Sequence, residues 1–312
     1  MATNKPVDKN KDGIPDGDVL SMDQLQARYK FAYDVIQGDP ELIALWKKAT
    51  NARKGYWTTE AFTAALHDTD WYKNKSESAR PAWVAERTGG ADWQTQLSDA
   101  ETRVREAALE MGATPSDADI ARLTRDYIYQ GWGDPARARQ LDQALSQYIG
   151  SPDGGFMRGN AGTLQEQMKA LAMANGLTFS DGYYEAAAKS VGARLTTADD
   201  WMRQIREQAA SLWPTWKDQI LAGSDAADLA SGYINTMAQT LEISPTSISL
   251  DDPSIRSAMT HTDDQGNPVA LSLWDFQRSL MQDERYKNTR KFNNDLASIG
   301  TDILKRMGFS GA

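Results

Sequence analysis

Acidic and amide side chains near the start of the chain have the spacing of a calcium-binding loop. Oxygen ligands fall at loop positions 1, 3, 5, 7 and 9, and Gly13 stands at position 6, where such loops turn sharply. Calcium is a hard cation that prefers clustered carboxylate, amide and carbonyl oxygens. The pattern predicts a Ca²⁺ site that orders this segment and takes no part in catalysis. Its ligands would be the side chains of Asp8, Asn10, Asp12 and Asp16 and the backbone carbonyl of Ile14.

The end of this loop departs from the pattern. Val19 occupies the last position, where a bidentate Glu is expected, and Asp18 comes one residue early. The segment also resembles the shorter calcium loops of dockerin and thrombospondin type 3 repeats, which close with Asp. Two interpretations stay open for residues 1–20: a calcium-ordered clip, or a flexible acidic arm without metal.

The residue types offer little support for a catalytic site. The chain has no Cys, which excludes disulfides, thiolate nucleophiles and Cys-ligated zinc. Its two His are far apart, and His67, beside Asp68 and Asp70, is either a surface residue or a metal ligand or base. There is no Gly-x-Ser-x-Gly elbow and no His-Glu-x-x-His zinc motif. We therefore predict that the protein is not an enzyme and has no cofactor besides the Ca²⁺ considered above.

The charge balance argues against two further classes of protein. With 43 acidic and 34 basic residues the formal net charge is −9, whereas nucleic-acid binders usually show a basic patch. No nucleic-acid partner is expected. No apolar run approaches the ~18 residues of a membrane-spanning helix, so no membrane span is expected. Residues 1–17 are polar and do not resemble a signal peptide, which predicts synthesis in a cytoplasm.

The elements that would position these residues are helices. Apolar residues recur at spacings of three and four from Ser21 onward, and glycines and prolines end one such run and open the next. Long helices are predicted over residues 92–111 and 288–307. Only residues 243–250 alternate like a strand, and Pro245 argues against a central strand there. The predicted fold is all-α and multi-helix, with almost no β structure.

A glycine-rich stretch divides the chain. We predict a flexible linker over residues 151–162, between an N-terminal helical domain over residues 21–150 and a C-terminal helical domain over residues 163–312. The two domains would be helical bundles. A helix, a glycine stop and a Thr-x-Ser-Asp cap recur 64 residues apart, which indicates either an internal duplication or shared capping chemistry alone. The matched residues are Ala108, Gly112, Thr114, Ser116, Asp117, Arg139 and Gln140 with Ala172, Gly176, Thr178, Ser180, Asp181, Arg203 and Gln204.

Aromatic residues are dense between Tyr56 and Trp83. Large aromatic side chains need burial or a partner surface, so this segment is either a small aromatic core or an exposed binding face. The pair Trp213-Pro214-x-Trp216 is either core packing where proline breaks a helix or a platform for a ligand.

Several motifs occur in a fixed order along the chain. They are Leu66-His-Asp-Thr69-Asp-Trp71-Tyr72, Arg80, Gln239-Thr-Leu-Glu-Ile-Ser-Pro245, Leu250-Asp-Asp-Pro253, Leu273-Trp274-Asp-Phe-Gln277 and Tyr286. In these motifs the chain resembles virion structural proteins of phages that infect actinobacteria, and the resemblance covers residues 40–312. It implies a virion component of the minor tail type that packs against other virion proteins, is oligomeric in the particle and is made in the host cytoplasm. It carries over no catalytic residues.

Two alternatives to this function remain open. The first is a tail-borne or ejected peptidoglycan hydrolase that uses a pair of carboxylates in a helical, lysozyme-like domain. The second is an internal head or scaffold protein present in many copies.

Overall fold

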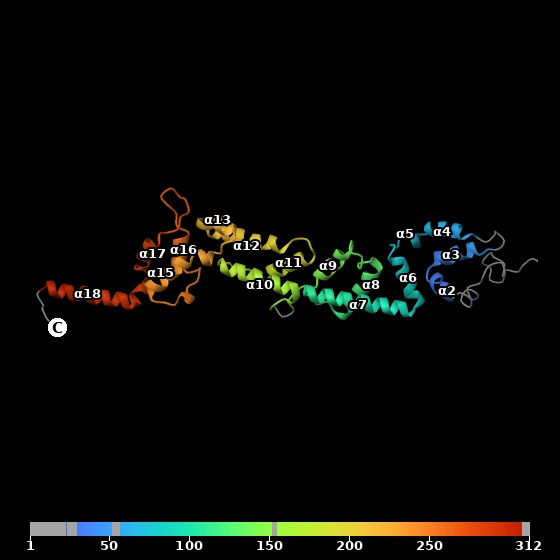
Figure 1. Ribbon diagram of the computed structural model, residues 1–312, viewed down its shortest axis with the longest axis horizontal. Helices are drawn as coiled ribbons and strands as arrows, with labels where there is room; N and C mark the ends of the chain where they lie inside the picture. The colour runs from blue at the N-terminus through green and yellow to red at the C-terminus, as the bar shows by residue number, and fades with distance from the viewer. Residues whose placement is uncertain (1–22, 24–29, 52–56, 152–154, 308–312) are drawn as a thin grey trace, which may run out of the picture. The chain divides into compact units, whose positions relative to one another are not determined.

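The computed structural model describes residues 23, 30–51, 57–151 and 155–307 (Figure 1). Within these residues the chain forms seventeen α-helices and no strand, with one isolated antiparallel bridge between Thr262 and Pro268. The predicted all-α fold is confirmed. None of the helices in these ranges is long and apolar enough to cross a lipid bilayer.

The chain divides into two compact units, Met1–Tyr148 and Ile149–Ala312. The predicted linker over residues 151–162 is too long, because helix α10 already begins at Gly159. Gly162 is buried, and a methyl group at its Cα would collide with the carbonyl of Met157. The buried side chain of Gln165 accepts a hydrogen bond from the Met157 N–H at 2.9 Å. Glycine therefore serves close packing at Gly162.

Unit 1 contains eight described helices whose starts follow the capping signals in the sequence. Asp39 caps α3 by accepting the N–H of Glu41 at 2.8 Å, and Pro40 stands at the first helical position. Ser116 and Asp119 form a reciprocal capping box on α8. The helices are α2 (Lys30–Ile36), α3 (Pro40–Ala49), α4 (Thr59–His67), α5 (Asp70–Lys73), α6 (Ala79–Thr88), α7 (Ala91–Met111), α8 (Asp117–Gln130) and α9 (Ala138–Ser146).

Unit 2 is built around one large core. Trp213, Phe276, Met237 and Ile255 are fully buried there. The helices are α10 (Gly159–Ala174), α11 (Asp181–Gly192), α12 (Ala198–Leu212), η2 (Pro214–Trp216), α13 (Lys217–Leu221), α14 (Ala226–Leu229), α15 (Ser231–Leu241), η3 (Pro245–Ser247), α16 (Pro253–Met259), α17 (Leu273–Leu280), η4 (Glu284–Asn288) and α18 (Arg290–Arg306). The burial of Trp213 at the proline break confirms the core interpretation of this pair.

Helices α7, α8 and α9 of unit 1 and α10, α11 and α12 of unit 2 share one pattern of burial. Buried residues of the first set correspond to buried residues of the second set 64 positions later in the sequence. Capping chemistry alone would not match burial along three helices, so the correspondence supports an internal duplication. The matched buried pairs are Trp93 and Met157, Ala100 and Leu164, Val104 and Met168, Ala108 and Ala172, Ile120 and Tyr184, Leu123 and Ala187, Leu141 and Ile205, and Leu145 and Ala209.

The first helix of each set also ends in the same way. Gly112 and Gly176 are left-handed, with φ of 86° and 70°. The next N–H reaches back to the carbonyl of Ala108 or of Ala172, at 2.8 Å in both sets, which is the glycine stop described for many helices. An ion pair to the start of the second helix recurs as well, from Arg105 to Asp117 at 3.1 Å and from Lys169 to Asp181 at 3.3 Å.

Two details of these helices depend on local contacts. Leu109 is 75% exposed, because the buried stripe of α7 passes through its neighbour Ala108. Helix α9 begins at Ala138, because the Asp134 carboxylate accepts the Ala136 N–H at 2.9 Å and holds a turn before the helix.

Candidate interaction surface

Helix α18 carries the most concentrated exposed apolar surface in the described part of the chain. From Asn293 to Met307 no side chain is buried, and the main contacts of the helix are with η4. The exposed apolar side chains, each more than half accessible, are Leu296, Ile299, Ile303, Leu304 and Met307. Exposed apolar groups that gather on one element are typical of protein interaction sites, whereas scattered ones are not.

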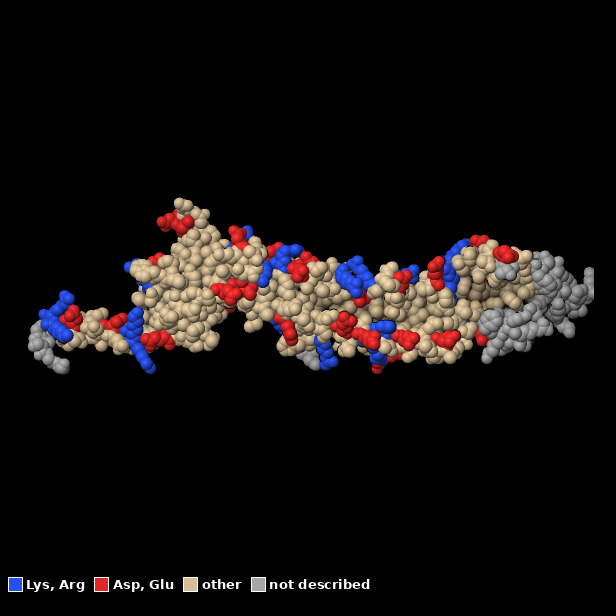
Figure 2. Space-filling model, viewed as in Figure 1, with Lys and Arg blue, Asp and Glu red and all other residues tan. Residues whose placement is uncertain are grey.

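Four apolar residues of α18 form a narrow stripe, and Leu304 and Met307 lie outside it. Phe292, Leu296, Ile299 and Ile303 follow each other at spacings of four, three and four residues. This alternation is the seam of a coiled coil, which is narrower than the face of a helix that packs on a globular core. In Figure 2 basic groups gather near both ends of α18, and acidic groups are set into the uncharged surface between them.

Helix α18 lacks the packing that normally stabilises a helix of its composition. Its 17 residues include Asn293, Asn294 and Gly300, which are weak helix formers. In proteins most helical stability comes from burial of an apolar face, which α18 does not achieve within its own chain over the described residues. The helix is therefore suited to pack against a partner.

The base of α18 is held firmly to unit 2 through Thr289. This residue is buried, and its hydroxyl caps the helix by accepting the Phe292 N–H at 3.1 Å. The same hydroxyl donates to the Tyr286 carbonyl at 2.8 Å. The rings of Tyr286 and Phe292 meet edge to face at 5.8 Å, so polar and apolar contacts fix the first turn together.

A second clamp on this base comes from Glu242, the residue that follows α15. Its carboxylate accepts the N–H groups of Arg290 and Lys291, at 3.0 and 3.1 Å. A carboxylate placed there accepts from two N–H groups that have no partner within the helix. Its negative charge also interacts favourably with the positive end of the helix dipole. Glu242 itself adopts a left-handed backbone, with φ of 54°. The direction of α18 is thus set by the end of α15.

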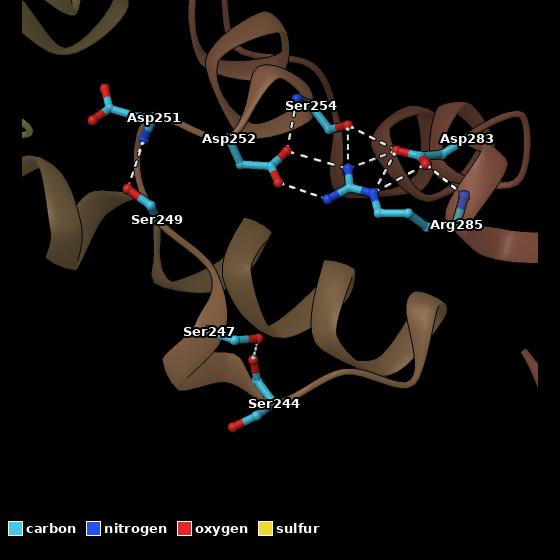
Figure 3. A network of polar contacts seen from close by, with 8 residues as sticks. All are labelled: Ser244, Ser247, Ser249, Asp251, Asp252, Ser254, Asp283 and Arg285. Carbon is cyan, nitrogen blue, oxygen red and sulfur yellow. Dashed lines mark hydrogen bonds and ion pairs between the residues drawn. The ribbon is translucent and has the colours of Figure 1, made fainter. Parts of the chain in front are cut away.

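A network around Arg285 braces the turn before α18 (Figure 3). The guanidinium contacts Asp252 at 2.7 Å and Asp283 at 2.6 Å, and it also donates to the Ser254 hydroxyl at 3.2 Å. Hydrogen bonding to Arg285 lowers the pKa of Asp283 to about 2. Burial acts to raise the pKa of Asp252, but the hydrogen bonds from Arg285 and the Ser254 N–H outweigh it and the pKa is lowered. A glycosidase general acid needs a shift in the opposite direction.

This network makes the stability of unit 2 depend on pH. The folded pKa of Asp283 is depressed from its ordinary 3.8 to about 2, so its stabilising contribution is complete above about pH 4 and is lost as pH falls toward 2. Because the Arg285 side chain is 42% exposed, solvent reduces the contribution to about 1–2 kcal/mol. Urea unfolding should show Asp283→Asn less stable than the natural chain at pH 6, with the gap closing toward pH 2. A gap that stays constant with pH would contradict this account.

The sequence-predicted calcium ligands Asp8, Asn10, Asp12, Ile14 and Asp16 lie outside the described residues. Within the described ranges no three His, Asp or Glu side chains converge in a way that could hold a metal ion. Calcium binding therefore stays a prediction. The predicted arm over residues 1–20 lies outside the described part as well.

The two histidines take different places. The ring of His67 is stacked on Tyr72, with ring centroids 4.2 Å apart. His261 lies beside the turn before α17, where its carbonyl accepts the Val269 N–H at 2.8 Å. Both side chains are exposed.

The aromatic segment of unit 1 forms a small core. Trp71 and Trp83 are buried and meet edge to face at 5.3 Å, against Ile36 and Leu42. The core interpretation is confirmed for these two residues. Beside them lies an open hollow of about 810 Å³, lined in part by Trp71, Tyr72, Arg80 and Trp93.

The apolar stripe of α18 was missed at the level of sequence, although the helix itself was predicted. Its signal was present in the spacing of Phe292, Leu296, Ile299 and Ile303, which is narrower than the stripe of a core helix. Whether such a stripe is covered depends on tertiary packing that the pattern does not contain.

Comparisons with protein-family models, with curated proteins and with solved structures found no match to this chain.

Proposed function

We propose that the protein is a structural component of a phage virion, associated with the tail, which acts by packing against other protein. The apolar stripe of α18 carries the assembly part of this proposal, because a helix that is clamped at its base and that the described residues leave uncovered from Asn293 onward is suited to bind a partner. The motif resemblance over residues 40–312 supports the virion and tail part.

The proposal predicts that the protein copurifies with intact particles of the phage that encodes it. Mass spectrometry of gradient-purified particles should detect its peptides, in the low copy number of a tail component. A phage encoding Ile303→Asp should incorporate the protein poorly, because a carboxylate would then interrupt the apolar stripe. Ser298→Asp, on the opposite face of the same helix, is the matched control and should be incorporated normally.

Two results would contradict parts of this proposal. Absence of the protein from purified particles would refute the virion role altogether. Copy numbers typical of a shell-filling component would favour an internal head or scaffold protein over a tail component.

A further inference from the structure

We infer that the partner of α18 is α18 of further copies of this chain, joined side by side in a parallel bundle. This inference deepens the assembly role proposed above and names its partner. In heptad terms the uncovered residues Leu296 and Ile303 occupy a positions, and Ile299 occupies the d position between them. Phe292, at the preceding d position, packs on the core of unit 2, and Arg306 stands at the following one. The stripe thus has the form that copies of one helix use to pair with themselves.

The charges beside the stripe distinguish parallel from antiparallel pairing. Asp295 and Asp302 lie along one edge of it, at g positions, while Asn293 and Gly300 lie along the other edge, at e positions. In a parallel bundle the g edge of each helix faces the e edge of its neighbour, so the carboxylates meet uncharged residues. Antiparallel pairing would place g edges together and bring Asp295 opposite Asp302 of the other copy, which is unfavourable.

Gly300 fits the same arrangement. It lies on the edge that would face Asp295 of the neighbouring helix, and apart from its own helix no atom of the described residues lies within 4 Å of the place a methyl group would take. Without a side chain it lets the neighbour approach and leaves the carboxylate in contact with water. A second copy therefore supplies an apolar stripe that matches the first. It also supplies an uncharged edge, at Asn293 and Gly300, that can lie beside Asp295 and Asp302 without a basic partner.

The types of the apolar residues indicate the number of copies. A β-branched residue at d disfavours two-stranded coiled coils, and leucine at a with isoleucine at d favours three or four strands. Leu296 and Ile299 provide that combination in the middle of α18. The expected assembly is therefore a trimer or tetramer.

Light scattering after size-exclusion chromatography of the full chain, over a range of concentrations, tests the association. The natural chain should reach three or four times the monomer mass. Ile299→Asp should weaken association on the order of 100-fold, as expected for loss of a central contact. Ser298→Asp, on the opposite face, is the matched control and should associate like the natural chain. Far-UV circular dichroism checks that both variants remain folded.

Cysteine cross-linking tests the orientation, because the natural chain has no Cys. Ile303→Cys should form disulfide-linked dimers on mild oxidation, since parallel helices in register place residue 303 beside its own copy. Ser298→Cys, facing away from the stripe, should form few. Antiparallel helices would place residue 303 opposite residues 292 or 299, and Ile303→Cys would then remain largely uncross-linked, which would overturn the parallel arrangement.

Two outcomes would overturn the inference as a whole: a chain that stays monomeric at all concentrations, or an oligomer that Ile299→Asp leaves intact. Either could occur while the protein is still found in virions, where a different component would then cover α18. Conversely, a self-associating chain that is absent from virions would refute the proposed function and leave this inference standing.

Discussion

Replacing Trp213 with alanine is expected to destabilise unit 2 by about 3–5 kcal/mol, the usual cost of removing a fully buried large aromatic side chain. Trp213 has no exposed surface, and its indole N–H donates to the Asn175 carbonyl at 2.9 Å. It also ends α12 immediately before the proline break. Truncation would leave a cavity in the middle of the core and a carbonyl without its donor, and neither defect can be repaired by solvent.

Urea unfolding followed by far-UV circular dichroism measures this effect. The matched control is Trp274→Ala, which removes the same side chain from a position that is 62% exposed. We expect the control to change the free energy of unfolding by less than about 1 kcal/mol, the range usual for surface positions. Equal effects of the two substitutions would mean that Trp213 does not anchor the core as its burial indicates.

Replacing Asn175 with leucine is expected to cost about 2–4 kcal/mol, because this fully buried amide ties the end of α10 to the start of α14. Its amide group donates to the Leu171 carbonyl at 2.9 Å and to the Asp225 carboxylate at 3.1 Å. Its side-chain oxygen accepts the Ala226 N–H at 3.0 Å, at the start of α14. Leucine has nearly the same size but leaves that buried N–H without an acceptor.

Asn160→Leu provides the control for this second substitution. Asn160 lies in the first turn of the same helix, α10, and is exposed. Thermal unfolding should therefore show a large decrease in melting temperature for Asn175→Leu and a small one for Asn160→Leu. A melting temperature for Asn175→Leu at or above that of the natural chain would show that the buried network adds nothing to stability, as happens for some buried polar groups.

The helices of this protein were readable from its sequence because their ends depend on local chemistry. Asp39, Ser116 and Gly112 each act within a few residues of their own position, so the pattern alone predicts the helix boundary. The 64-residue repeat was visible for the same reason. The match of Arg139-Gln140 with Arg203-Gln204 already carried it into a third helix. The matched core residues, such as Trp93 and Met157, differ in type, so their correspondence emerged only from burial.

Long-range polar contacts could not be predicted in this way. The contact of Arg285 with Asp252 spans 33 residues and that of Asn175 with Asp225 spans 50. In a chain with 43 acidic residues, pairing rules do not select one carboxylate for a given partner. The exposed apolar face of α18 could not be predicted either, because the exposure of a residue depends on how the whole chain folds.

The clamp at the base of α18 has a mechanical consequence. Glu242 follows the last residue of α15 and accepts hydrogen bonds from the first two N–H groups of α18. The hydroxyl of Thr289, just before the helix, also donates to the Tyr286 carbonyl. These contacts restrict rotation of α18 about its first turn. A partner protein bound to α18 would therefore be held at a fixed angle to the rest of unit 2. A force applied to the helix would be transmitted to α15 and to the core that α15 packs on.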